Sequence, residues 1–226
     1  MKRNSLDPEL KDLPAHIPIF PLDGALLLPS GRLPLNIFEP RYLNMVSDTL
    51  STPHRLIGMI QSNTGVTQDE MSPLLYSVGC AGRISSFEET NDGRYVISLD
   101  GMIRFHIIEE IGGKSGYRQC KVSYDKFADD MHVQDNVSYD RGRLIKVLKR
   151  YFQIKGFSAD WTSIESCGDE KLITTLSMIC PLAVAEKQML IEAKNISTRG
   201  DLISTILEME CEMVNADMQK QGYVKH

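Results

Sequence analysis

Apolar and polar positions follow two different patterns along the chain, and the change falls near residue 127. Before this point, short apolar runs are separated by Gly, Pro, Asn and Asp, which is typical of strands joined by turns. After it, apolar residues recur at intervals of three and four, which predicts amphipathic helices. The pattern therefore predicts an α+β fold, with a closed or half-closed antiparallel β barrel followed by a helical bundle.

The first part is expected to contain one helix among its strands. Pro40 can begin this helix, Pro40–Leu50, because the N–H that proline lacks would be unpaired at the first helical position anyway. Asn91–Gly93 and Asp100–Gly101 are typical of tight hairpin turns. The predicted strands are Ile17–Leu22, Ala25–Leu28, Leu33–Phe38, Arg55–Gln61, Ser77–Glu89, Arg94–Leu99, Met102–Ile111 and Tyr117–Tyr124.

The second part is expected to fold into helices joined by short connections. Helical spacing marks the segments 137–152, 172–179 and 183–193, with Met189 and Leu190 turned inward in the last of these. Ser197 and Thr198 are candidate N-caps for a final helix. The segment Gly156–Asp169 is expected to link two of these helices. In the first part of the chain, the polar segment Ser62–Pro73 is expected to be an exposed loop.

These patterns predict a division of the chain into segments with different roles. We expect an N-terminal tail over 1–16, a β subdomain over 17–127, a linker over 128–136, a helical subdomain over 137–218 and a C-terminal tail over 219–226.

Composition and charge exclude several functional classes. With a formal net charge of -5, the chain lacks the excess of Lys and Arg expected of a protein that binds nucleic-acid phosphates. No segment has the roughly 18 consecutive apolar residues that a transmembrane helix needs, and no secretory signal follows the N-terminus. We therefore expect a cytoplasmic protein that contacts neither nucleic acid nor membrane.

The residues that could carry chemistry are scattered rather than grouped. The five histidines lack the spacing of a helical metal pair, and the five cysteines form no C-x-x-C motif. We expect Cys80, Cys120, Cys180 and Cys211 to be buried thiols. Adjacent carboxylates such as Glu88 and Glu89 point to opposite faces of a strand. The sequence therefore predicts no catalytic residues, no metal site and no cofactor, and hence no enzyme.

The segment PIFPLDGALLLPSGRLPLNIFEPRY closely resembles the opening of the Lon substrate-binding domain family, the N-terminal module of Lon-type ATP-dependent proteases. The resemblance continues through VGCAGRISSFEETNDGRYVISLDGMIRFHI and PLAVAEKQMLIEAKNISTRGDLISTILE, so it covers Ile17–Met218. It implies a pseudo-barrel of the PUA-like type with a helical C-terminal part. The ATPase and peptidase motifs of a complete Lon protease are absent, so a free-standing module is expected.

The resemblance also implies a function, which is the binding of unfolded or exposed polypeptide segments. The protein would act as an adaptor or holdase linked to proteolysis, with a protease or chaperone as a further partner. RNA binding by a PUA-like barrel and an unassigned hydrolase activity are the alternatives. The candidate contact residues lie where a predicted strand meets the helix, and a structural role in helix packing or capping is open for each of them. They are Phe38, Glu39, Arg41 and Tyr42.

Overall fold

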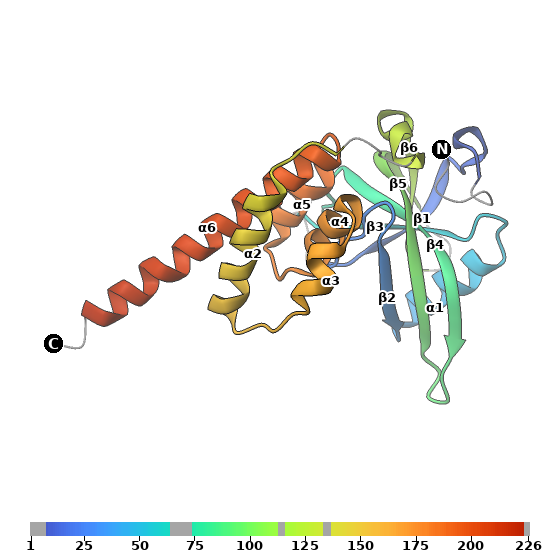
Figure 1. The fold of residues 1–226 in the computed structure, drawn as a ribbon. Helices are drawn as coiled ribbons and strands as arrows, with labels where there is room; N and C mark the ends of the chain where they lie inside the picture. Colours follow the sequence, from blue (N-terminus) through green and yellow to red (C-terminus); the bar gives the residue numbers. More distant parts are fainter. Residues whose placement is uncertain (1–7, 64–73, 113–115, 133–136, 224–226) are drawn as a thin grey trace. The chain divides into compact units, whose positions relative to one another are not determined.

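The computed structural model describes residues 8–63, 74–112, 116–132 and 137–223, and the chain forms two compact units (Figure 1). Unit 1 comprises Met1–Val133 and Met178–Glu192, whereas unit 2 comprises Gln134–Ser177 and Ala193–His226. Unit 1 holds the sheet and unit 2 is helical, so the predicted α+β class is confirmed.

Among the described residues, unit 1 contains all of the strands, two short 3-10 helices and two α-helices. One of the α-helices is inserted between strands, as the sequence predicted for Pro40–Leu50. The elements are η1 (Leu10–Asp12), β1 (His16–Pro21), β2 (Arg32–Ile37), α1 (Pro40–Leu50), β3 (Leu56–Ile60), β4 (Val78–Glu89), β5 (Tyr95–Ile111), β6 (Arg118–Ser123), η2 (Asp125–Met131) and α5 (Val184–Glu192).

The sheet closes on itself through one strand. Its order is β2-β5-β4-β3-β1-β6, and β5 also pairs with β6, so the ladders run in a circuit from β5 back to β5. β2 joins this circuit from outside, along the first half of β5. The ladders are antiparallel as predicted, except that β1 and β3 pair in parallel. Parallel neighbours need a crossover connection, and the segment with β2 and α1 provides it.

β5 is one continuous strand, although two strands separated by a turn at Asp100–Gly101 were predicted. A glycine is needed at position 101 because a side chain would not fit there, and not because the backbone turns. A Cβ at this position would collide with the carbonyl oxygen of Leu28. Its partner across the ladder is Gly82, where a Cβ would lie 2.5 Å from Leu27. The two paired glycines therefore form a notch in the sheet that receives Leu27 and the backbone of Leu28.

The predicted strand Ala25–Leu28 is not a strand. Its leucines, Leu26 to Leu28, are all at most 2% exposed, whereas a strand with a solvent face would expose alternate side chains. Ser30, at φ 64°, turns the backbone, and its N–H donates to the carbonyl of Gly101 over 2.9 Å. The segment is thus a buried loop seated on the glycine notch.

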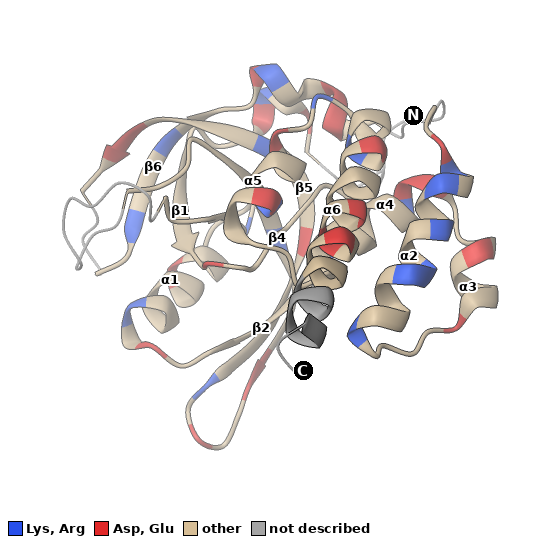
Figure 2. Ribbon diagram, turned by 90° about the vertical axis from the view of Figure 1, so that its left-hand side faces the viewer, with Lys and Arg blue, Asp and Glu red and all other residues tan. Residues whose placement is uncertain are grey.

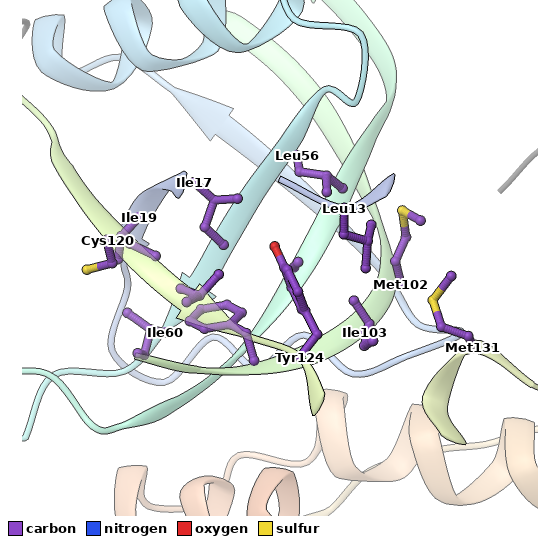
Figure 3. Close-up of a cluster of buried hydrophobic side chains, with 13 residues drawn as sticks. Leu13, Ile17, Ile19, Leu56, Ile60, Met102, Ile103, Cys120, Tyr124 and Met131 are labelled. Atoms are coloured by element: carbon purple, nitrogen blue, oxygen red, sulfur yellow. The ribbon is translucent and has the colours of Figure 1, made fainter. Parts of the chain in front are cut away.

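A core cluster of unit 1 is formed by side chains from β1, β3, β4, β5 and β6 and from the segments that flank them (Figure 3). Ile17 and Ile19 of β1 are joined by Ile103 of β5, and Tyr124 reaches the same cluster while its hydroxyl donates to the Pro14 carbonyl over 3.0 Å. All of these residues are less than 10% exposed. Burial of such side chains stabilises a fold by about 1.5–3 kcal/mol each.

A buried ion pair lies inside this unit. Arg104 of β5 is 3% exposed, and its guanidinium donates two bonds of 2.8 Å to the carboxylate of Asp130 in η2. Its Nη1 donates to the Ile191 carbonyl of α5 over 2.9 Å, and the group lies 4.5 Å from the ring centroid of Phe127. Arg104 thereby connects the strand, the 3-10 helix and α5.

Unit 2 is built from α2 (Arg141–Lys155), α3 (Trp161–Ser166), the first part of α4 (Asp169–Ile179) and α6 (Ile196–Tyr223). Asp140 caps α2 by accepting from the Arg143 N–H over 2.8 Å. The predicted linker Gly156–Asp169 contains α3, whose six residues are too few to show a helical period.

Two details of the later helices differ from the predictions. Asn195 caps α6 by accepting from the Thr198 N–H over 2.9 Å, so Ser197 and Thr198 lie inside the helix. Met189 of α5 was expected to point inward but is 50% exposed, whereas Leu190, which was also expected to point inward, is buried. A helix of this length buries one stripe, and adjacent residues on it diverge by about 100°.

The domain boundaries expected from the sequence stay predictions. The compact units differ from them chiefly at Met178–Glu192, which belongs to the unit with the sheet although it lies within the expected helical subdomain. The Lys187 ammonium donates to the Gly24 carbonyl over 2.5 Å, and Gln188 donates to the Val78 carbonyl over 3.2 Å. Most of the predicted loop Ser62–Pro73 lies outside the described residues.

Candidate functional site

A pocket of about 170 Å³ lies where β1 and β2 end and α1 begins. It brings together all of the contact residues proposed from the sequence. The lining residues are Phe20, Pro21, Leu22, Leu35, Asn36, Ile37, Phe38, Glu39, Arg41 and Tyr42. We call this site the edge pocket.

The sheet topology explains why the edge pocket is open. The ladder between β1 and β6 ends at Ile19 opposite Arg118, so Phe20 and Pro21 extend beyond it. β2 joins the sheet by pairing with β5 and not with β1. The pocket therefore lies between the end of β1 and the outer side of β2, and α1 forms its remaining wall.

Tyr42 forms the buried wall of the edge pocket. Its side chain is 6% exposed, and its ring centroid lies 4.2 Å from that of Phe20. The Arg41 guanidinium lies 4.6 Å from the Tyr42 ring centroid. Burial raises the pKa of the Tyr42 hydroxyl above its usual value, although the charge of Arg41 opposes the shift. Tyr42 thus stays neutral at physiological pH and contributes an aromatic surface.

Glu39 and Arg41 form a polar rim. Arg41 donates from Nε to the Glu39 carboxylate over 2.9 Å, and both side chains are about half exposed. Glu39 occupies the N-cap position of α1, but its side chain makes no capping bond. Its carbonyl oxygen instead accepts from the N–H groups of Tyr42 and Leu43. The backbone of Glu39 therefore begins the helix while its carboxylate pairs with Arg41.

Phe38 is the exposed aromatic residue of the site. Its side chain is 63% exposed, and the Arg94 guanidinium lies 5.8 Å from its ring centroid. Its ring therefore presents an apolar surface to water at the mouth of the pocket. The structural role that the sequence left open for Phe38, packing in the core, does not fit this exposure.

Sequence reasoning did not single out Phe20, Leu35 and Asn36, which also line the pocket. Phe20 meets Tyr42 only through the tertiary fold, since 22 positions separate them. The family-like segment contained all three residues, but no local pattern distinguished them from core positions.

The basic face of α2 is a second candidate surface. A groove of about 580 Å³ runs along it, with Arg143, Lys146 and Arg150 on one side and Glu208 and Glu212 of α6 on the other. Figure 2 shows basic positions along the ribbon of α2 and acidic positions along that of α6. Arg143 pairs with Glu208 and Arg150 with Glu212. Because these charges already neutralise one another, the groove is a weaker candidate than the edge pocket.

The expected buried thiols are confirmed, since Cys80, Cys120, Cys180 and Cys211 are buried and Cys167 is partly accessible. Burial raises the pKa of Cys120 and of Cys180 to about 11. Among the described residues, no group of three or more His, Cys, Asp or Glu side chains is arranged to hold a metal ion. Within the same residues, no helix is both long and apolar enough to cross a membrane.

We predict that iodoacetamide labels Cys167 first at pH 8. A thiol of pKa about 11 is ionised in only about one molecule in a thousand at that pH, so Cys120 and Cys180 should react slowly. Peptide mass spectrometry over time measures the order, and denaturant should make the rates similar. Labelling of Cys180 before Cys167 in the folded protein would contradict the burial described above.

The described fold and pocket define a β-rich domain with a helical unit, and comparison with known proteins gives its family. The family model of the ATP-dependent protease La (LON) substrate-binding domain matches residues 16–209. The chain belongs to this family.

Individual relatives agree with this assignment. A Lon protease of Anaeromyxobacter dehalogenans is 22% identical over 95% of this chain and 26% of its own length, and Lon protease 2 of Sorangium cellulosum is 30% identical over 40% of this chain. The chain thus spans about a quarter of the first of these proteins.

Solved structures share the fold. The Lon N-terminal domain protein from Xanthomonas campestris has a TM-score of 0.57 at 25% identity, covering 81% of this chain and 94% of that one. The N-terminal domain of the Mycobacterium avium complex Lon protease has a TM-score of 0.60 at 15% identity, covering 85% and 98%.

Proposed function

We propose that the protein binds segments of unfolded or exposed polypeptide in the edge pocket and acts as an adaptor or holdase linked to proteolysis. The observation that carries this proposal is the arrangement of Phe38, Glu39, Arg41 and Tyr42 around one pocket. The family name describes a substrate-binding domain, which supports a ligand of this class. A cytoplasmic location stays a prediction from the sequence.

The size and lining of the edge pocket suit one apolar side chain. An apolar cavity of about 150 Å³ holds benzene, and the edge pocket measures about 170 Å³. Phe20 and Tyr42 provide rings that a ligand side chain can pack against. Such a pocket accepts Phe, Leu or Met without strong preference, as a binder of diverse unfolded segments requires.

The surroundings of the pocket suit a polypeptide rather than a small molecule. Phe38 extends the apolar surface outward, and Glu39 and Arg41 offer an acceptor and donors beside it. A peptide backbone carries both kinds of group at every residue except proline. The rim can therefore contact the main chain next to an inserted side chain, whatever the sequence.

We predict that Phe38→Ala weakens peptide binding by about tenfold or more, as loss of an aromatic anchor typically does. The probes are fluorescent peptides of a Ser/Thr/Gln host that carry one central Phe, Leu or Ser, and anisotropy measures their affinity. Stability should change little, because Phe38 is mostly exposed.

Phe87→Ala is the matched control, since Phe87 is also exposed, at 42%, but does not line the pocket. Equal losses in both variants would show that binding occurs elsewhere. If no peptide binds and the protein instead retains RNA in a salt-dependent manner, the RNA-binding alternative replaces this proposal.

A further inference from the structure

β2 has one backbone edge without a strand neighbour among the described residues, because its only ladder there is with β5. The hydrogen-bonding groups of successive strand residues point to opposite sides, so alternate residues of β2 face away from β5. Which residues these are follows from the bonds at the two ends of the ladder between β2 and β5.

The hairpin bond from the Thr90 N–H to the Arg94 carbonyl assigns Arg94 to the β4 side of β5. Tyr95 and Ile97 therefore bond toward β2, where their partners are Ile37 and Leu35. At the other end, the Gly101 N–H donates to the Gly31 carbonyl over 2.8 Å, which agrees with this alternation.

The outward-facing residues of β2 are consequently Arg32, Pro34 and Asn36. We call their backbone groups the β2 edge. The side chains of all three are exposed. Pro34 fits this assignment, because proline in a sheet is confined to positions whose missing N–H would face away from the ladder.

Asn36 connects the β2 edge with the edge pocket. It is the last outward-facing residue of β2, and it also lines the pocket beside Leu35 and Phe38. A chain bonded to the Asn36 N–H and C=O would therefore run directly past the pocket mouth. One of its side chains could enter the pocket while its backbone continues along Pro34 and Arg32.

We infer that the polypeptide ligand binds as an added β-strand on the β2 edge, with one large apolar side chain in the edge pocket. This inference rests on the proposed function and specifies its substrate class, which is an extended segment with an apolar anchor and no proline at the bonded positions. Main-chain hydrogen bonds supply affinity that does not depend on sequence, and the pocket selects the anchor.

Pro34 limits how many bonds this strand can form. The β2 edge offers carbonyl groups at Arg32, Pro34 and Asn36 but N–H groups only at Arg32 and Asn36. Proline on an exposed edge also discourages pairing between copies of a protein. The β2 edge can thus bind a ligand strand weakly, while Pro34 limits its pairing with further copies of the protein.

The decisive experiment is a scan of N-methylation along the tightest-binding peptide of the Ser/Thr/Gln series. N-methyl groups at alternate residues, which donate to β2, should weaken binding by about tenfold or more, whereas those at the intervening residues should have little effect. Uniform tolerance of N-methylation would overturn the added strand while leaving binding in the pocket intact. Failure of every unmodified peptide to bind would instead overturn the proposed function itself.

A gain-of-function variant gives an independent readout. Pro34→Ala adds one outward-facing N–H and should tighten peptide binding by several-fold to about tenfold. Pro53→Ala, in an exposed turn, is the matched control and should leave affinity unchanged. Self-association of Pro34→Ala without tighter peptide binding would show that a second copy, rather than a ligand peptide, occupies the edge.

Discussion

Arg104→Met should lower the free energy of unfolding by about 3–5 kcal/mol, the usual cost of removing one partner from a buried ion pair. The variant leaves the Asp130 carboxylate in a site where its side chain is only 11% exposed. It also removes the donor to the Ile191 carbonyl and the contact with the Phe127 ring. Chemical denaturation measures the change.

Arg32→Met is the matched control for this prediction. Arg32 pairs with Asp100 over 2.7 Å, but the side chains are 68% and 41% exposed. Exposed pairs contribute about 0–1 kcal/mol, so the control should change stability little. A double variant, Arg104→Met with Asp130→Leu, should recover part of the loss because no buried charge is left unpaired. Equal effects of Arg104→Met and Arg32→Met would mean that Arg104 is not buried as described.

Gly101→Ala should destabilise the protein by about 3 kcal/mol or more, at the upper end of the usual cost of overpacking. The added methyl group would collide with the carbonyl of Leu28, and backbone cannot move aside as a flexible side chain can. Thermal and chemical denaturation provide the measurement.

Gly112→Ala tests whether the effect comes from this collision. A Cβ at Gly112 would have no neighbour within 4 Å, so the substitution should be nearly neutral. If Gly101→Ala were equally neutral, the buried loop at Leu26–Leu28 could not be seated on the sheet in the way described.

The same glycine shows where sequence patterns stop being informative about the fold. Asp100–Gly101 resembles a hairpin turn, and only the approach of Leu28 reveals that Gly101 lies within a continuous strand. The helix Pro40–Leu50 was predicted correctly because its signals, proline at the first turn and an apolar face, are local. Glycine has several uses, and the one that applies depends on residues distant in sequence.

The candidate site was predictable only in part, for a similar reason. Phe38, Glu39, Arg41 and Tyr42 are close in sequence, and the junction of strand and helix marked them as a group. Phe20 joins them through the sheet, and the β2 edge exists because the neighbours of β2 are set by the order of the strands. Strand order is a property of the whole fold, which no single segment encodes.

The assignment of α5 to unit 1 has a consequence for how the protein is made. The sheet is complete in sequence at Ser123, but Lys187 and Gln188 of α5 bond to carbonyl groups of Gly24 and Val78. During synthesis, the segment 134–177 must therefore leave the ribosome before unit 1 acquires its last element. During that interval the carbonyl groups of Gly24 and Val78 lack the donors that α5 supplies, and a fragment cut after residue 133 would lack them permanently.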